Sequence, residues 1–328
     1  MLVKILHACR GAAIGLAEVI PGVSGGTLAF ITGIYYQLIE SIKSFDLEFF
    51  GLLLSGKFIA AWEKVNGKFL LPLLLGMLVG LVIGILLISE LLESHPPVVW
   101  GFFFGLILAS SWYILRRIEG FNLRLALFVG IGTLIAYGIT TLSPAEGSSA
   151  YPAIFLSGSI AICALILPGI SGSFILLLMG MYTMILSEAR SFIQFRDFDA
   201  LLVLIVFVAG ALLGLLVFTR LISWLLNHYQ KTVYALLCGF MIGSLNAIWP
   251  WRDPVLFLDA EGNIIPSAFP LTGDFKVLQE VNKWPADYMS GPAFTVAVIL
   301  AFIVGVGIVL VMDQIEIKNG SDRKTIEK

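Results

Sequence analysis

Two short stretches of this chain, VIPGVSGG at residues 19–26 and ILPGISGS at residues 166–173, decide the fold. Each interrupts a long apolar run with Pro, Gly and Ser in the same order. Proline cannot donate a backbone hydrogen bond and glycine widens the accessible φ/ψ range, so each stretch predicts a break in a helix. The match continues at the same spacing further along, in Gly33 and Tyr35 of the first copy and Gly180 and Tyr182 of the second. This order predicts that the chain contains two copies of one unit, over residues 1–146 and 147–328.

The composition of the chain is that of a protein embedded in a membrane. Hydrophobic types make up 59% of its 328 residues and charged types 13%, against about 25% charged residues in a soluble domain. The mean hydropathy is +0.97. A net charge of −2 excludes the basic surface that nucleic-acid binding requires. The three cysteines stand singly, and no spacing of metal ligands or cofactor motif is present in the sequence, so neither a metal nor a cofactor is expected. We therefore predict an all-α polytopic membrane protein.

The apolar segments divide into simple spans and interrupted regions. About 20 apolar residues cross a bilayer as a helix, and six segments fit: 69–89, 97–115, 123–142, 200–219, 231–249 and 292–312. Regions 3–42 and 150–187 are too long for one span and contain the breaks, which predicts a broken, re-entrant helical hairpin in each. The remaining segments are an amphipathic surface segment at 45–68, a long outer loop at 250–290 and a charged tail at 313–328.

The number of spans and the charges predict how the copies are oriented. Each copy is one hairpin plus three spans, and because three is odd the second copy is expected to be inverted relative to the first. With this topology 15 of the 20 Lys and Arg residues fall on one side, and the other side holds Arg190, Arg196, Arg252, Lys276 and Lys283. The positive-inside rule then places both termini in the cytoplasm, in a multi-pass protein of a bacterial cytoplasmic (inner) membrane.

Glycines spaced by four residues predict close helix packing. Gly80 and Gly84 are matched with Gly210 and Gly214, and Gly101 and Gly105 with Gly239 and Gly243. Small residues at this spacing let helix backbones approach one another. They serve internal contacts as well as a homodimer, so the sequence leaves the oligomeric state open.

The breaks are the candidate binding site. Ser24 and Ser171 stand where the next half-helix begins, and the first N–H groups of a helix favour an anion. Irregular backbone at membrane depth is tolerated only where it is buried in protein or lines a wet cavity. Two breaks in inverted repeats indicate one shared site near the bilayer midplane. The alternative is a pair of kinks with packing glycines and capping serines.

Two charged residues precede the first break. Glu18 lies three residues before Pro21, and an intramembrane carboxylate is costly and commonly functional. Its role is either that of a proton carrier in a coupling cycle or that of a neutral acid hydrogen-bonded to the hairpin turn. Arg10, about two helical turns earlier, is placed to meet an anionic head group or to lie in the membrane interface.

These motifs resemble the bacterial polyprenyl-phosphate transporter family. The resemblance rests on the two paired breaks, on Arg10-Gly11 and on the Gly-x-Tyr sequences that begin at Gly33 and Gly180, and it covers about residues 5–312. It implies a flippase that returns undecaprenyl phosphate, the lipid carrier of cell-wall assembly, across the cytoplasmic membrane. Carried over to this chain, the motif positions are Glu18, Pro21, Gly22, Ser24, Gly25, Gly26, Thr27, Pro168, Gly169, Ser171, Gly172 and Ser173. We infer that these positions, together with Arg10, bind the substrate.

Other functions remain open from the residues. An ion-coupled carrier of a small soluble anion would use the same breaks, with either a proton or Na⁺ as the coupling ion. A membrane lipid-pyrophosphate phosphatase also pairs two such breaks. However, phosphoryl transfer requires cationic clamps and an acid–base set, whereas the second motif contains no Arg and the first lacks a His and a second nearby acid. A transporter without catalytic residues is therefore the favoured interpretation.

Overall fold

The computed structural model describes residues 2–19, 24–142, 144–145, 147–258, 264–266 and 276–319. The first half of the chain comprises α1 (Leu2–Glu18), α2 (Gly25–Ile31), α3 (Tyr35–Lys43), α4 (Leu47–Leu54), α5 (Phe58–Lys64), α6 (Gly67–Ile83), a π-helical turn η1 (Gly84–Ile88), α7 (Ser89–Ser94), α8 (Pro96–Arg117) and α9 (Leu123–Thr141). The second half comprises α10 (Tyr151–Ile166), α11 (Gly172–Leu178), α12 (Tyr182–Phe195), α13 (Phe198–Ser244), a 3₁₀ turn η2 (Leu245–Ile248), three strands and α14 (Thr295–Asn319).

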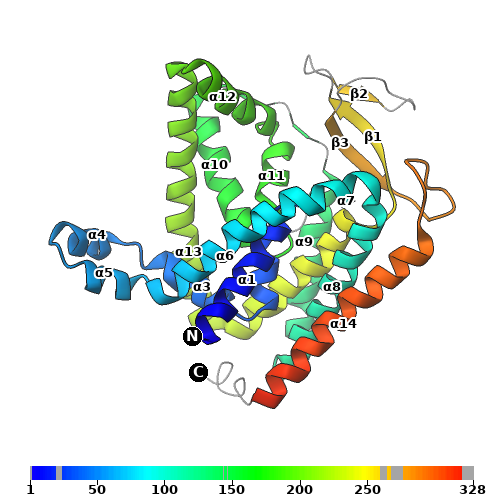
Figure 1. Ribbon diagram of the computed structural model, residues 1–328, viewed down its shortest axis with the longest axis horizontal. Coiled ribbons are helices and arrows are strands. Elements are labelled where there is room, and N and C mark those ends of the chain that lie inside the picture. The colour runs from blue at the N-terminus through cyan, green and yellow to red at the C-terminus, as the bar shows by residue number, and fades with distance from the viewer. Residues whose placement is uncertain are drawn as a thin grey trace.

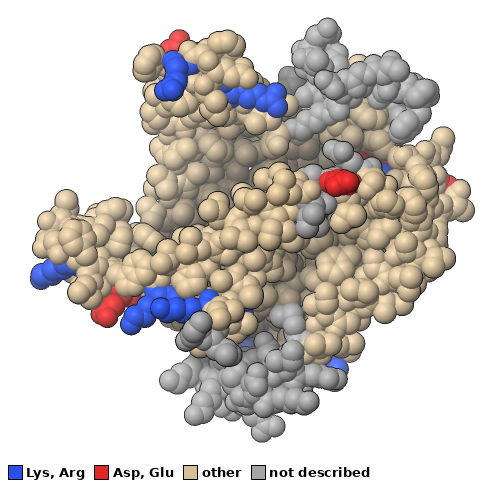
Figure 2. Space-filling view, viewed as in Figure 1, with Lys and Arg blue, Asp and Glu red and all other residues tan. Residues whose placement is uncertain are grey.

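The helices form one bundle with two distinguishable ends (Figure 1). The end that carries α7, α12 and the strands is called the sheet end here. The opposite end, where α1 begins and α14 ends, is called the N-terminal end. Charged side chains gather around α4–α5 and toward the ends, and a broad uncharged surface separates them (Figure 2). This distribution is that of a protein whose middle lies in hydrocarbon.

Each predicted span corresponds to a helix or to part of one. Four described helices are long and apolar enough to cross a membrane: Gly67–Leu86, Pro96–Arg117, Leu123–Thr141 and Phe198–Ile248. The chain is thus an all-α polytopic membrane protein, as predicted. Predicted spans 200–219 and 231–249 correspond to the two helical parts of α13, which are joined at a kink. Only Tyr229 leaves helical geometry inside it, at φ −136° and ψ 39°. The two parts of α13 meet at this residue.

The two interrupted regions have the same local structure. Ser24 and Ser171 both adopt extended backbone, at φ −96° and −91°, and each precedes a helix of seven residues. Each of these short helices ends at a glycine with positive φ, Gly33 at 72° and Gly180 at 66°, where only glycine is unstrained. The second pair, α11 and α12, is bent by 107°. The predicted breaks are therefore present, with Pro21 and Gly22 themselves outside the described residues.

Glycines bring the broken helices against their neighbours. A Cβ added at Gly76 or Gly80 of α6 would lie 2.0 Å from the carbonyl oxygen of Ala8 or Ala12 in α1. In the second half, Gly210 and Gly214 of α13 meet Phe155 and Ser159 of α10 in the same way. By these contacts Gly76 and Gly80 correspond to Gly210 and Gly214. The pairing with Gly80 and Gly84 inferred from the sequence is one helical turn too late.

The last helix of each half packs against a helix of the other half. Gly239 and Gly243, in the later part of α13, pack on Val129 and Thr133 of α9. Gly101 and Gly105 of α8 pack on α14, where an added Cβ at Gly105 would lie 2.3 Å from the Phe302 carbonyl oxygen. Each half therefore completes its packing with a helix of the other half, so neither half is a separate core.

Two segments lie outside the bundle. The predicted amphipathic segment 45–68 forms α4 and α5, which project sideways from the bundle (Figure 1). Lys64 holds this pair together through Glu48 and through Asp46, whose carboxylate lies 3.1 Å away. The backbone N–H of Phe49 and the neighbouring Lys64 lower the pKa of Asp46, because both favour its ionised form.

The predicted loop 250–290 is more ordered than the sequence indicated. It contains an antiparallel sheet in the order β2-β1-β3, formed by β1 (Arg252–Leu258), β2 (Ile264–Pro266) and β3 (Lys276–Asn282). The Trp, Pro, Asp and Gly residues of this segment suggested irregular structure. Pro254 is accommodated next to a register shift between β1 and β3, as expected for proline in a strand.

The α1–α6 contact gives a direct test of the packing. An alanine at Gly11 would place its Cβ 2.0 Å from the Leu73 carbonyl oxygen, so Gly11→Ala should destabilise the protein by about 1–3 kcal/mol through overpacking. Gly138→Ala is the matched control, because nothing lies within 4 Å of a Cβ at that helical glycine. Thermal unfolding in detergent should show a lower midpoint for Gly11→Ala alone. Equal midpoints for both variants would contradict the packing.

Candidate functional site

At the first break, side chains accept hydrogen bonds from the backbone N–H groups at the start of α2. Glu18, the last residue of α1, accepts a hydrogen bond from the Gly25 N–H through Oε1 at 2.9 Å. The Ser24 hydroxyl accepts from the Gly26 N–H at 3.1 Å and caps α2. Two of the N–H groups that α2 leaves unpaired are therefore satisfied by side chains of the break itself.

The same serine reaches the second break. Its Oγ lies 3.2 Å from the carbonyl oxygens of Leu165 and Leu167, at the end of α10. These carbonyls are among the groups that a helix end leaves without an intrahelical partner. Ser24 is 1% exposed, so its hydroxyl is fully engaged in joining the two breaks.

A second hydrogen bond joins the breaks in the opposite direction. The backbone N–H of Gly169 donates to Thr27 Oγ1 at 2.8 Å, and Gly169 adopts φ +86°. A Cβ at Gly26 would lie 2.4 Å from the Ile166 carbonyl oxygen. The two backbones thus approach so closely that glycine is required at this crossing.

The second break borders a small pocket. The pocket is lined by Gly169, Ile170, Ser171 and Phe174 of the break, by Ala136, Ile139 and Thr140 of α9, and by Ala247 of η2. The hydroxyls of Ser171 and Ser173 lie 2.9 Å apart. Ser173 is exposed, whereas Ser171 is 9% exposed. A pair of hydroxyls beside a pocket offers donors to an anionic group.

The structure therefore separates the candidate residues into groups. Ser24, Gly26 and Thr27 form the contact between the breaks, and Gly25 bonds to Glu18 beside them. Opposite lie Leu167 and Gly169, the two residues that flank Pro168. Ser171 lies at the pocket with Ser173 beside it, and Gly172 packs on Ala161 of α10. Arg10 lies two turns earlier on α1 and takes no part in the contacts described above between the breaks.

A polar track that the motifs do not predict leads from the pocket to the sheet. The Asn246 side chain donates to Thr140 Oγ1 at 2.8 Å, and Asn282 of β3 donates to Asn246 Oδ1 at 2.8 Å. Asn282 is in turn the partner of Arg252 across the sheet. Isolated Thr and Asn residues near helix ends carry no periodic signal, so sequence reasoning had no means of grouping them.

Arg252 is the cation of this track. Its side chain is 13% exposed, lies 2.8 Å from Glu280 Oε2 and stacks 4.3 Å over the Trp100 ring. It also donates to the carbonyl oxygen of Ala247, a residue that lines the pocket. Burial lowers the pKa of the guanidinium, and the Glu280 carboxylate opposes that shift.

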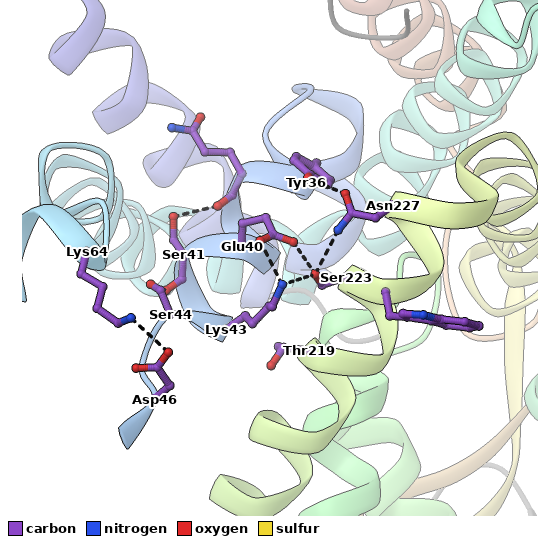
Figure 3. A network of polar contacts seen from close by, with 12 residues as sticks. Tyr36, Glu40, Ser41, Lys43, Ser44, Asp46, Lys64, Thr219, Ser223 and Asn227 are labelled. Atoms are coloured by element: carbon purple, nitrogen blue, oxygen red, sulfur yellow. Dashed lines mark hydrogen bonds and ion pairs between the residues drawn. The ribbon is translucent and has the colours of Figure 1, made fainter. Parts of the chain in front are cut away.

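At the N-terminal end a second polar network joins α3 to α13 (Figure 3). Lys43 lies 3.3 Å from Glu40 and donates to the buried Ser223 hydroxyl at 2.8 Å, and that hydroxyl donates to Glu40. Tyr36 donates to Asn227 at 2.8 Å one turn further along α13. The network lies close to the kink at Tyr229.

These features define a polytopic membrane protein with two broken helices that meet and a small pocket beside them that Ser171 and Thr140 line. Residues 14–264 match the model of a family described as undecaprenyl phosphate translocase-like. A polyprenyl-phosphate transporter of Vibrio cholerae is 43% identical over 258 residues, which cover 78% of this chain and 82% of that protein. One from Staphylococcus aureus is 31% identical over 259 residues, which cover 75% and 87%.

The chain therefore belongs to the undecaprenyl phosphate translocase-like family. The family resemblance inferred from the paired motifs is confirmed. No solved structure matches this chain.

The Thr27–Gly169 bond gives a test of the contact between the breaks. Thr27→Val keeps the side-chain shape but removes the acceptor, which leaves the buried Gly169 N–H unpaired. We expect a loss of about 1–3 kcal/mol in the free energy of unfolding. Thr27→Ser restores the acceptor and should recover most of that loss. Chemical denaturation in micelles measures both, and a Thr27→Val variant as stable as the wild type would contradict the contact.

Proposed function

We propose that this protein is a flippase that moves undecaprenyl phosphate, or a closely similar polyprenyl phosphate, across the cytoplasmic membrane. The pocket beside Ser171 is the observation on which the proposal rests, because it puts hydroxyl donors next to a helix break inside the membrane domain. The curated relatives are named polyprenyl-phosphate transporters, which supports this substrate class. The protein would conduct only the phosphate through its interior while the isoprenoid tail stays in lipid.

The Ser171 side of the site binds the head group in this proposal. Ser24 and Thr27 are engaged in bonds between the breaks, whereas the Ser171 and Ser173 hydroxyls share one bond at the pocket. Because α11 has only seven residues, hydroxyl donors rather than its dipole would provide most of the interaction. The role is transport rather than catalysis, and the substrate leaves unchanged.

The proposed transport cycle uses inverted repeats. The matching breaks, the equivalent glycine contacts and the packing of α9 and α14 each on a helix of the other half support two copies related by inversion. Together with the charge bias of the loops, this supports a topology with the N-terminal end in the cytoplasm and the sheet end outside. The pocket would then face the outer leaflet, from which released carrier has to return.

While the pocket faces the outer leaflet, the network between α3 and α13 closes the cytoplasmic side of the site in this proposal. Glu18 remains the candidate coupling residue, with a proton or Na⁺ as the coupled ion, because its carboxylate touches the first N–H group of α2. Opening toward the cytoplasm would separate α3 from α13 and release the hydroxyl of Ser223 from Lys43 and Glu40.

Liposomes containing a labelled polyprenyl phosphate test the function. The wild type should accelerate exchange of the lipid between leaflets, and Ser171→Ala combined with Ser173→Ala should reduce that rate by about tenfold or more, since charge-assisted hydrogen bonds to the phosphate are lost. Ser187→Ala is the matched control, because its hydroxyl caps a carbonyl of α12 away from the pocket. Uptake of a soluble anion without movement of lipid would favour the alternative carrier.

The same vesicles test the coupling residue. Glu18→Gln should abolish the response to an imposed pH or Na⁺ gradient while lipid exchange without a gradient persists, because Gln keeps an acceptor for the Gly25 N–H but cannot ionise. A gradient response that survives in Glu18→Gln would remove this residue from the coupling step.

The closure at the N-terminal end predicts a change in local opening. Ser223→Ala removes the hydroxyl that Lys43, Asn227 and Glu40 share. Hydrogen–deuterium exchange of the α3 amides should become faster in this variant, because fewer side-chain bonds hold α3 to α13. Ser187→Ala should leave exchange in α3 unchanged. Unaltered exchange in Ser223→Ala would show that the network does not hold this end closed.

A further inference from the structure

A buried, incompletely paired arginine lies at the start of the sheet, next to a residue that lines the pocket. Arg252 begins β1, and its Nε is buried without a hydrogen-bond partner in the described protein. A buried guanidinium donor left unpaired is costly. The remainder of the group is held by Glu280, by the Trp100 ring and by the Ala247 carbonyl oxygen.

The neighbouring acidic group is already satisfied. Asp253 is 5% exposed and accepts hydrogen bonds from the backbone N–H groups of Met289 and Ser290 and from the Ser290 hydroxyl. Glu280 is therefore the carboxylate that neutralises Arg252 here. Glu280 comes from β3 and its side chain is 33% exposed, so it can withdraw into water.

The location links this cation to the pocket beside Ser171. Ala247 both lines the pocket beside Ser171 and accepts a hydrogen bond from Arg252. The side chains of Thr140, Asn246 and Asn282 continue the polar surface from the pocket to the strand position opposite Arg252. An arginine matches a phosphate monoester through parallel N–H donors, which a lysine cannot reproduce.

We propose that Arg252 is the cation that receives the phosphate head group at the sheet end. Until the head group arrives, the Glu280 carboxylate occupies the position beside Arg252 that the phosphate will take. The inference rests on the proposed function, since it names the entry residue of the same transport site. The phosphate displaces the Glu280 carboxylate, gains the unpaired Nε donor, and then passes along the Asn246–Thr140 track to Ser171.

Opposite effects of two substitutions test this exchange. The full-length protein in nanodiscs is titrated with a short-chain polyprenyl phosphate, and quenching of tryptophan fluorescence, to which Trp100 contributes, reports binding. Arg252→Gln should weaken binding by about tenfold or more, and Arg252→Lys should recover only part of it. Glu280→Gln should tighten binding by about threefold or more, because the competing carboxylate is removed.

The control is Lys283→Gln, which removes a positive charge just after β3 and should leave affinity unchanged. If the pair only holds the sheet in place, Arg252→Gln and Glu280→Gln will both weaken binding and both lower the melting temperature, which overturns the inference. Should Arg252→Gln fail to fold, Glu280→Gln still decides, because unchanged or weaker binding contradicts displacement.

Inorganic phosphate serves as a second probe and separates the two proposals. Wild-type protein that binds inorganic phosphate but not the lipid overturns the proposed function and the inference with it. Wild-type protein that binds the lipid, with Arg252→Gln binding equally well, overturns the inference alone and leaves the transport function standing.

Discussion

A helix that breaks inside a bilayer exposes backbone groups for which hydrocarbon offers no partner, and this constraint organises the structure. The chain meets it by bringing its two breaks together. Ser24 reaches the carbonyl ends of α10, and Thr27 accepts from the N–H of Gly169, so each break satisfies backbone groups of the other. The breaks are therefore one structural unit built from segments more than 140 positions apart in the chain, and the pocket lies on the side of that unit left open.

The remainder of the bundle supports this meeting point. Glycines let α6 and the first part of α13 lie directly on the helices that lead into the breaks. The packing of α9 on α13 and of α14 on α8 ties the two halves together. Polar contacts then differ at the two ends, with the α3–α13 network at one and the Arg252 track at the other. This difference fits the proposed cycle, in which the site opens to one side at a time.

The sequence was informative where a physical pattern is local. Apolar length predicted the spans, and the Pro-Gly-x-Ser-Gly order predicted both breaks, each with a serine just before the next helix. It could not show that Ser24 is engaged by α10, because that bond depends on how distant segments fold together. The one-turn error in the glycine pairing has the same origin, since glycines at every fourth position of α6 look alike until their partner helix is known. The sheet and Arg252 were missed because a Trp- and Pro-rich segment gives no clear strand alternation.

The position of bound phosphate is the most direct measure of the central claim, that the head group binds at the meeting of the two breaks. An electron cryomicroscopy structure of the full-length protein in nanodiscs with polyprenyl phosphate would show it. The account predicts phosphate density within hydrogen-bond distance of the Ser171 and Ser173 hydroxyls, with the isoprenoid tail leading out to lipid. Density confined to the surface of α4–α5, with an empty pocket beside Ser171, would contradict it.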